Sequence, residues 1–181
     1  MKKLFTLLIA FIGVSSFLYA QSPAAKTCIY IVRHAEKDVS DPKNSDPYLS
    51  MDGNVRAKAL AATLKREKFA AIYSTKYKRT TQTAAIVAEK NKVPIVFYNP
   101  VDPKVLAELI KTKYKGQKVL IVGHSNTVLE LTEAFGVIRP LAVLTDDDYD
   151  FIFKVEVDHT GFASLTTGNY GKQHHTSVIK K

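Results

Sequence analysis

Short apolar segments with the pattern of β-strands alternate with amphipathic segments along most of the chain, and this alternation limits the fold more than any other feature. Residues at helical spacing, such as Ala57, Leu60 and Leu64, mark the buried face of one such amphipathic segment. Strands that alternate with helices are typical of a parallel sheet covered on both faces. The sequence therefore predicts an α/β fold, a three-layer α/β/α sandwich with a mostly parallel central sheet.

The expected elements can be placed along the chain from these patterns. Strands are expected at residues 28–32, 71–73, 95–97, 119–122, 151–157 and 162–167. Helices are expected to begin near Ser50, Lys78, Pro103 and Val128. The last two strands are joined by residues 158–161, whose composition predicts a hairpin turn. Residues 170–181 are polar and basic without periodicity, which predicts a tail.

The first twenty residues differ from the rest of the chain. Lys2 and Lys3 give a basic start, residues 4–17 are almost wholly apolar, and the small residue Ala20 precedes Gln21. This pattern predicts a signal peptide over residues 1–20, a mature domain over 21–181, and a periplasmic or secreted location. A retained anchor is the alternative, because the apolar run is close to the lower limit of about 17 residues for a membrane span. No later segment is apolar enough to cross a membrane.

Composition limits the partners and crosslinks of the chain. The net charge of +9 favours anionic partners in general. The lysines are scattered rather than interleaved with aromatic residues on one strand, so we expect no nucleic-acid partner. Cys28 is the only cysteine and lies in an apolar run, which predicts a buried thiol and excludes an internal disulfide.

Two histidines and two arginines are placed to meet at one edge of the predicted sheet. Arg33 and His34 directly follow the first strand, and His124 follows Gly123 at the end of another. Arg79 lies at the start of a helix, where free backbone amides favour an anion. In open α/β sheets, ligands bind beyond the carboxyl ends of the strands. The four side chains therefore form a candidate binding site.

This set of side chains suits a phosphoryl group. Planar guanidinium groups pair with phosphate oxygens through charge-assisted hydrogen bonds. A neutral imidazole can attack phosphorus, which divides one difficult hydrolysis into two transfers. A second imidazole can remain protonated beside the anion.

Four motifs resemble those of the histidine phosphatase superfamily, also called phosphoglycerate mutase-like. They are Arg33-His34-Ala35-Glu36, Leu49 to Gly53 followed by Arg56-Ala57, Ser74 to Ala84, and Gly123-His124-Ser125. The compact chain also resembles the short, single-domain branch that contains phosphohistidine phosphatases. By this resemblance, His34 is the phosphorylated nucleophile, and Arg33, Arg79 and His124 complete the phosphate pocket. Arg33, Arg79, Glu36 and Ser125 are the candidate substrate contacts. The resemblance implies no metal and no organic cofactor.

The acidic residue with which many members of this family protonate the leaving group is not evident here. Asp102 is the nearest carboxylate after the strand 95–97, but it also suits the N-cap of the helix that begins at Pro103. We favour the cap, in which case the chain acts best on substrates with good leaving groups. Glu36 is a second candidate, although its place beside His34 equally suits orienting an arginine or the substrate.

Other polar residues fit a solvated surface better than a site. His159 lies in the expected turn, and His174 and His175 lie in the expected tail, so solvent exposure explains them better than metal binding. Asp146, Asp147, Asp148 and Asp150 lack the glycine and closing glutamate of a calcium loop, and a solvated loop is the better interpretation.

The expected function is that of an exported phosphatase acting on a phosphomonoester or phosphoramidate. Its partner would be a phosphorylated small molecule or a component of the cell envelope. A mutase is disfavoured because export separates the chain from glycolytic substrates. The alternative from another class is a phosphate-binding or partner-binding module that retains the arginines without turnover. A covalent phosphate on His34 separates the two, because a binding module forms none.

Overall fold

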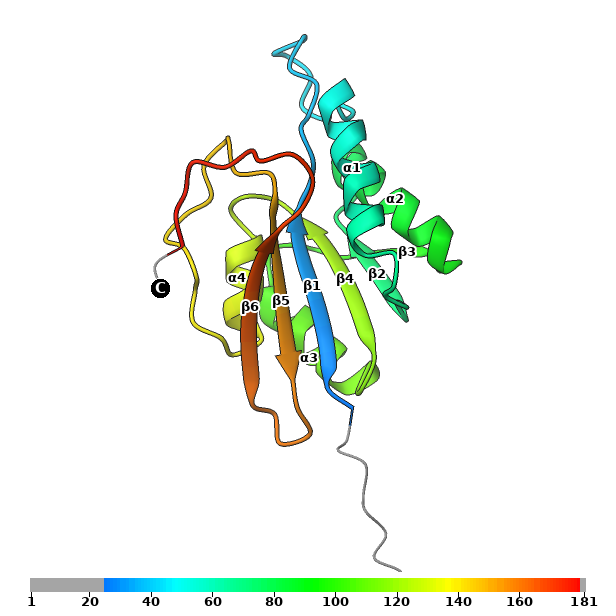
Figure 1. The fold of residues 1–181 in the computed structure, drawn as a ribbon, viewed down its shortest axis with the longest axis vertical. Coiled ribbons are helices and arrows are strands. Elements are labelled where there is room, and N and C mark those ends of the chain that lie inside the picture. The colour runs from blue at the N-terminus through cyan, green and yellow to red at the C-terminus, as the bar shows by residue number, and fades with distance from the viewer. Residues whose placement is uncertain (1–24, 180–181) are drawn as a thin grey trace, which may run out of the picture.

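The computed structural model describes residues 25–179, which form one six-stranded sheet with helices on both faces (Figure 1). The elements follow in the order β1 (Thr27–Arg33), α1 (Met51–Thr63), β2 (Ala71–Ser74), α2 (Lys78–Asn91), β3 (Ile95–Phe97), α3 (Pro103–Lys113), β4 (Lys118–Gly123), α4 (Val128–Ala134), β5 (Phe151–Val157) and β6 (Ala163–Asn169). Every strand and helix predicted above is present, with small differences at the ends. The predicted signal peptide lies outside the described residues. Between residues 25 and 179, no helix is long and apolar enough to cross a membrane.

The sheet is mixed, in the strand order β3-β2-β4-β1-β5-β6. The first four of these strands are parallel, whereas β5 runs antiparallel to β1 and forms a hairpin with β6. The three-layer α/β prediction is therefore confirmed, with the antiparallel hairpin added at one edge. Parallel register pairs Arg33 of β1 with Gly123 of β4, so the carboxyl ends of these strands lie side by side.

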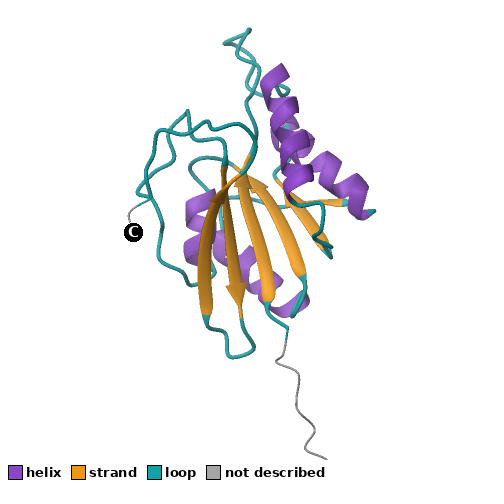
Figure 2. Cartoon of the chain, viewed as in Figure 1, coloured by secondary structure: helices purple, strands orange, loops and turns teal. Residues whose placement is uncertain are grey.

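Alternate residues of the central strand β1 supply two separate cores. Ile29 and Ile31 pack with α3 and α4 on one face, while Tyr30 and Val32 pack with α1 and α2 on the other. Figure 2 shows these two helix layers on opposite sides of the sheet. Because side chains of a strand alternate between its faces, an apolar run such as β1 is required for burial on both sides. This packing holds the strand whose end carries the candidate site.

The start of α1 lies against the segment that follows β1. Ser50 caps the helix by accepting a hydrogen bond from the Gly53 amide at 3.0 Å. The carbonyl oxygen of Glu36 accepts the Ser50 amide at 2.9 Å. A Cβ atom at Gly53 would overlap that same carbonyl oxygen. Glycine at this position therefore permits the helix to approach the backbone directly beside the candidate site.

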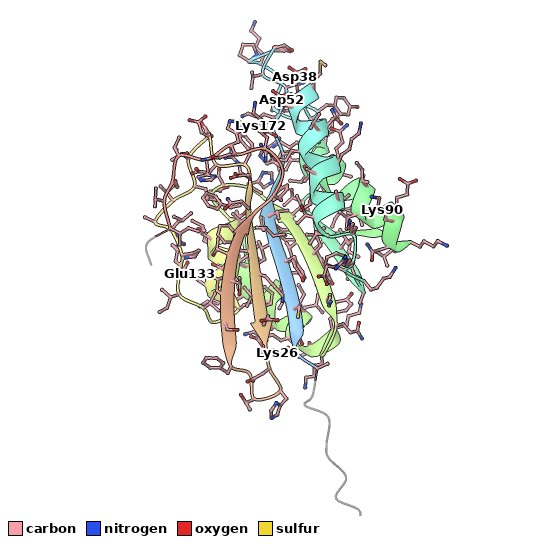
Figure 3. All side chains as sticks on the ribbon, in the orientation of Figure 1. Lys26, Asp38, Asp52, Lys90, Glu133 and Lys172 are labelled. Atoms are coloured by element: carbon pink, nitrogen blue, oxygen red, sulfur yellow. The ribbon has the colours of Figure 1, made fainter. Side chains whose placement is uncertain are left out.

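Residues 170–179, which we call the C-terminal strap, correct two of the predictions. His174 and His175 were expected to be solvent-exposed in this tail, but Tyr170 is buried, and the strap crosses the end of β1 and then follows the loop before β5 (Figure 1). Its Lys172 lies at the same end of the molecule as Asp52 of α1, opposite Lys26 (Figure 3). The exposure of the two histidines is only partial because the strap finds hydrogen-bond partners in distant parts of the sequence, such as Glu36 and Asp148.

The acidic loop before β5 is the second correction. Asp146 and Asp147 are exposed as expected, but Asp148 and Asp150 are each 1% exposed. Their carboxylates accept hydrogen bonds from the strap, so burial does not leave them unpaired. His174 and His175 are likewise only partly exposed, and each contacts a carboxylate. His159, by contrast, is exposed in the β5–β6 turn as predicted.

Candidate active site

Both predicted histidines meet at the carboxyl edge of the parallel strands. His34 follows β1 and His124 follows β4, and their ring centroids are 5.3 Å apart. The two strand ends are joined by a hydrogen bond of 2.9 Å from the His34 amide to the Gly123 carbonyl. At Gly123, a Cβ atom would lie only 2.9 Å from the hydroxyl of Tyr98. The glycine therefore permits Tyr98 to pack closely against the end of β4.

A hydrogen bond to the backbone of the next residue holds His34 in one tautomer. Its Nδ1 lies 2.8 Å from the carbonyl oxygen of Ala35, and its side chain is buried. A carbonyl oxygen can only accept, so Nδ1 carries the hydrogen and donates it. The lone pair of the neutral ring is thereby placed on Nε2, which is the nitrogen free to act as a nucleophile.

Electrostatics also keep the His34 imidazole neutral. Burial lowers its pKa to about 3, the hydrogen bond to Ala35 opposes this shift, and the nearby charges of Arg33 and Arg79 lower the pKa further. His34 is therefore in its nucleophilic form at any pH well above its depressed pKa.

This depressed pKa predicts an acid-sensitive contribution to stability. The unfolded chain binds a proton at His34 near pH 6.5 and the folded chain does not, so stability falls as the pH decreases between these two pKa values. From near neutral pH to about pH 5, the expected loss from this one residue is about 2 kcal/mol. The His34→Asn variant should lack this loss. Urea unfolding of both proteins at the two pH values checks it, and equal pH slopes would contradict the prediction.

His124 belongs to a polar chain that the sequence did not reveal. Its Nε2 lies 2.8 Å from Oγ1 of Thr75, which lies 2.9 Å from Oγ1 of Thr80. The ring of Tyr77 packs edge-on against the His124 ring, with centroids 5.1 Å apart. Burial lowers the pKa of His124 to about 4, and Arg79 and Arg33 add to this effect. A bound phosphoryl dianion would counter the two arginines and favour the protonated ring.

Arg33 and Arg79 each retain a donor suited to an anion. Arg33 is buried beneath the ring of Tyr149, 4.0 Å from its centroid, and Arg79 lies 4.5 Å from the ring centroid of Tyr77. Within the described part of the chain, the buried Nε atoms of both arginines have no hydrogen-bond partner. Since buried donors are normally paired, two such atoms near His34 fit the oxygens of a phosphoryl group.

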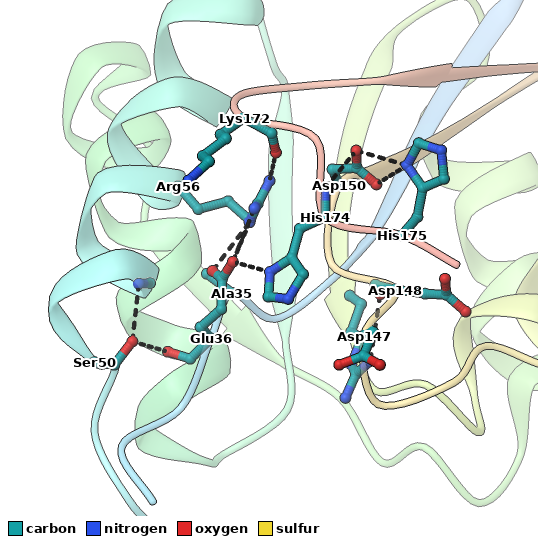
Figure 4. A network of polar contacts seen from close by, with 12 residues as sticks. Ala35, Glu36, Ser50, Arg56, Asp147, Asp148, Asp150, Lys172, His174 and His175 are labelled. Carbon is teal, nitrogen blue, oxygen red and sulfur yellow. Dashed lines mark hydrogen bonds and ion pairs between the residues drawn. The ribbon is translucent and has the colours of Figure 1, made fainter. Parts of the chain in front are cut away.

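Two other predicted site residues have their own partners, and a third lies beside His124. The Glu36 carboxylate accepts hydrogen bonds from Arg56 Nε at 2.8 and 3.0 Å and contacts His174 Nδ1 at 2.7 Å (Figure 4). It thus joins α1 to the strap. Asp102 caps α3 by accepting the Val105 amide at 3.2 Å, as the favoured interpretation proposed. Ser125 directly follows His124 and is partly exposed.

A cavity of about 380 Å³ lies beside His124. Its wall includes Thr75 and Tyr77, which both contact His124, together with Phe97 and Tyr98 at the end of β3. Phe97 is half exposed there. The cavity therefore offers apolar surface beside His124. Over residues 25–179, no three His, Cys, Asp or Glu side chains are grouped to hold a metal ion.

Comparisons with known proteins agree with this geometry. Residues 29–99 match the model of the histidine phosphatase superfamily (branch 1). The fold is similar to that of a mycobacterial glucosyl-3-phosphoglycerate phosphatase, with a TM-score of 0.65 and 14% identity over 81% of this chain and 100% of that one. It is also similar to the protein histidine phosphatase SixA in complex with tungstate, with a TM-score of 0.65 and 17% identity over 78% of this chain and 96% of that one.

No curated protein sequence matches the chain significantly. The family match covers the segments that carry Arg33, His34 and Arg79. The similarity of fold to the two phosphatases extends over more of the chain than this match. Residues 29–99 therefore match the histidine phosphatase superfamily, and the chain as a whole shares the fold of the two phosphatases.

Proposed function

We propose that this chain is a phosphatase that hydrolyses a phosphomonoester or phosphoramidate through a phosphohistidine intermediate on His34. The observation that carries the proposal is the buried, neutral His34 ring, whose Nδ1–H donates to Ala35 and leaves Nε2 free beside Arg33 and Arg79. The family and the fold of known phosphatases support the same reaction class.

The proposed reaction has two transfers. In the first, the Nε2 lone pair of His34 forms a bond to phosphorus, and the bond from phosphorus to the leaving oxygen or nitrogen breaks. In the second, water attacks phosphorus and gives a proton to His124, which was left neutral when it protonated the leaving group. The nitrogen–phosphorus bond then breaks, and phosphate and neutral His34 are released. Arg33 and Arg79 stabilise the charge on the equatorial oxygens in both transfers.

The protonation of the leaving group sets the substrate class. His124 is the titratable group next to His34, and protonated His124 can donate its Nε2 hydrogen, with Thr75 as its partner when no substrate is bound. Asp102 is engaged as a helix cap. A site with this acid alone favours substrates with good leaving groups, such as aryl phosphates or phosphoramidates.

Export is part of the same proposal. The segment over residues 1–20 has the composition of a signal peptide, which favours a periplasmic or secreted phosphatase. Its substrate would then be a phosphorylated small molecule or envelope component outside the cytoplasm. By their names, the two phosphatases of similar fold act on glucosyl-3-phosphoglycerate and on phosphorylated histidine of a protein, which supports both the ester and the phosphoramidate class.

Trapping the intermediate tests the proposal. The protein from Gln21 onward is mixed with para-nitrophenyl phosphate and chelator, denatured in alkali because phosphohistidine is labile in acid, and mapped by mass spectrometry. We expect one phosphate on His34 and none in His34→Ala. Turnover without phosphate on His34 would contradict the mechanism. Phosphate binding with neither turnover nor a covalent phosphate would favour the binding module.

A further inference from the structure

The loop of residues 145–150 and the C-terminal strap form a connected set of contacts that ends at Arg33. The loop of residues 145–150, which precedes β5, lies between Arg33 and the C-terminal strap. Figure 4 shows the part of this network around Asp148, Asp150 and His174. Neither segment has regular secondary structure, so side chains and backbone groups must satisfy one another directly.

The loop holds Arg33 from one side. Arg33 Nη1 donates to the carbonyl oxygen of Thr145 at 2.6 Å and to that of Asp148 at 3.3 Å. Tyr149, the next residue of the loop, places its ring against the guanidinium group. Arg33 Nη2 also pairs with Asp146, but that carboxylate is fully exposed and contributes little. The two carbonyls and the ring therefore fix the plane of the guanidinium.

The Asp148 carboxylate sets the shape of this loop. One oxygen accepts the amide and hydroxyl of Thr145 at 2.6 and 2.9 Å, which closes the turn that carries both carbonyls. The strap supplies the remaining donors, which are the amides of Thr176 and Ser177 at 2.9 and 3.0 Å and the Ser177 hydroxyl at 2.6 Å. Burial alone would raise the pKa of Asp148, but these hydrogen bonds hold it well below its ordinary value.

The strap is itself anchored on both sides. His174 contacts Glu36 at 2.7 Å, and its carbonyl accepts the Tyr149 amide at 2.9 Å. His175 contacts the Asp150 carboxylate at 2.8 Å. The His174 ring also packs on the Tyr149 ring, with centroids 5.2 Å apart. The strap thus reaches Arg33 by two routes, through the Asp148 turn and through Tyr149.

We propose that Asp148 is a positioning residue for the phosphate-binding Arg33, and that the C-terminal strap is thereby part of the apparatus that binds phosphate. This inference rests on the proposed function, because it assigns Arg33 to phosphate. Asp148 does not contact substrate. Its carboxylate holds the carbonyls of Thr145 and of Asp148 itself where they orient Arg33, so that the free Nε edge of the guanidinium is aimed before substrate arrives.

A double-mutant cycle with inorganic phosphate as the probe tests this role. Binding is measured by calorimetry for the protein from Gln21 onward and for Asp148→Asn, Arg33→Ala and the double variant. The substitution Asp148→Asn replaces one acceptor oxygen with an amide donor, which then faces the N–H and O–H groups of Thr145 and the strap. We expect it to weaken phosphate binding by about 10- to 100-fold, as loss of orientation does. In the Arg33→Ala background, the same substitution should change binding by less than about twofold.

Two further variants separate positioning from general loss of stability. Asp150→Asn is the matched control, because Asp150 is equally buried and also contacts the strap but has no role in the Thr145–Asp148 turn. We expect it to change phosphate affinity by less than about threefold. If Asp148→Asn fails to fold, Ser177→Ala removes one donor to the same carboxylate, and its smaller loss of affinity should also vanish in Arg33→Ala.

The outcomes distinguish this inference from the proposed function. Equal losses of affinity from Asp148→Asn with and without Arg33, or an equal loss from Asp150→Asn, would overturn the positioning role and leave the phosphatase proposal intact. Failure of the unmodified protein to bind phosphate would overturn both, because Arg33 would then have no phosphate to orient. Phosphate binding without hydrolysis of para-nitrophenyl phosphate would overturn the phosphatase proposal alone.

Discussion

Replacing His34 by alanine is expected to lower the turnover of para-nitrophenyl phosphate by at least about 10³-fold, because the variant has no atom that can form the bond to phosphorus. His124 lies beside the vacated position, but in the proposed reaction its Nε2 carries the proton for the leaving group, and a protonated ring has no lone pair with which to attack phosphorus. Initial rates with chelator present, measured from acid to neutral pH on the protein from Gln21 onward, give the comparison.

The control for this experiment is His159→Ala. His159 is exposed in the β5–β6 turn at the other end of the sheet. The variant makes the same histidine-to-alanine change away from the site, so its rate should equal that of the unmodified protein. Substantial activity in His34→Ala with a folded protein would exclude the phosphohistidine route. Loss of activity in both variants would show that the effect is not specific to His34, and would equally count against its role as the nucleophile.

Gly53→Ala should produce the largest loss of stability from a single methyl group, about 3 kcal/mol or more in the free energy of unfolding. A Cβ atom there meets a backbone carbonyl, that of Glu36, which cannot turn aside as a flexible side chain can. The same carbonyl accepts the hydrogen bonds of Ser50 that begin α1. Relief of the overlap therefore requires α1 to move away from the segment that follows His34.

Gly168→Ala is the matched substitution. A Cβ atom at Gly168 lies 3.5 Å from its nearest neighbour, Ile152, which is ordinary van der Waals contact. Urea unfolding of both variants should show a large decrease in the midpoint for Gly53→Ala and little change for Gly168→Ala. If Gly53→Ala unfolds at the same urea concentration as the unmodified protein, the close approach of α1 to Glu36 is wrong.

The sequence was sufficient to predict the elements because each carries its own local signal. Strands such as β1 and β4 are buried on both faces and therefore appear in the sequence as continuous runs of apolar residues. Ser50 and Pro103 mark the starts of helices, and Gly136 marks the end of one. The sequence could not predict that β5 pairs antiparallel with β1. Strand direction depends on how the chain returns to the sheet, and the irregular segment before Phe151 has no pattern that specifies it.

Part of the candidate site could be predicted for the same reason. His34 and His124 directly follow recognisable strands, so their meeting follows from the topology alone. The strap and the acidic loop carry no periodicity, and their contacts join residues far apart in sequence. A signal for one missed partner did exist. Arg56 shares the buried face of α1 with Leu60, and a charged residue there implies a buried counterion, which is Glu36.

The position of β1 in the middle of the sheet divides the site into two parts that differ in resistance to local opening. His34 extends a strand hydrogen-bonded to neighbours on both sides, and such backbone is released only when the whole domain unfolds. Arg33 is the last residue of the same strand, but its side-chain partners belong to irregular segments that can open at lower free energy. Proteolytic cleavage near the strap during such openings is therefore expected to weaken the contacts that hold Arg33 and to leave His34 in its folded position.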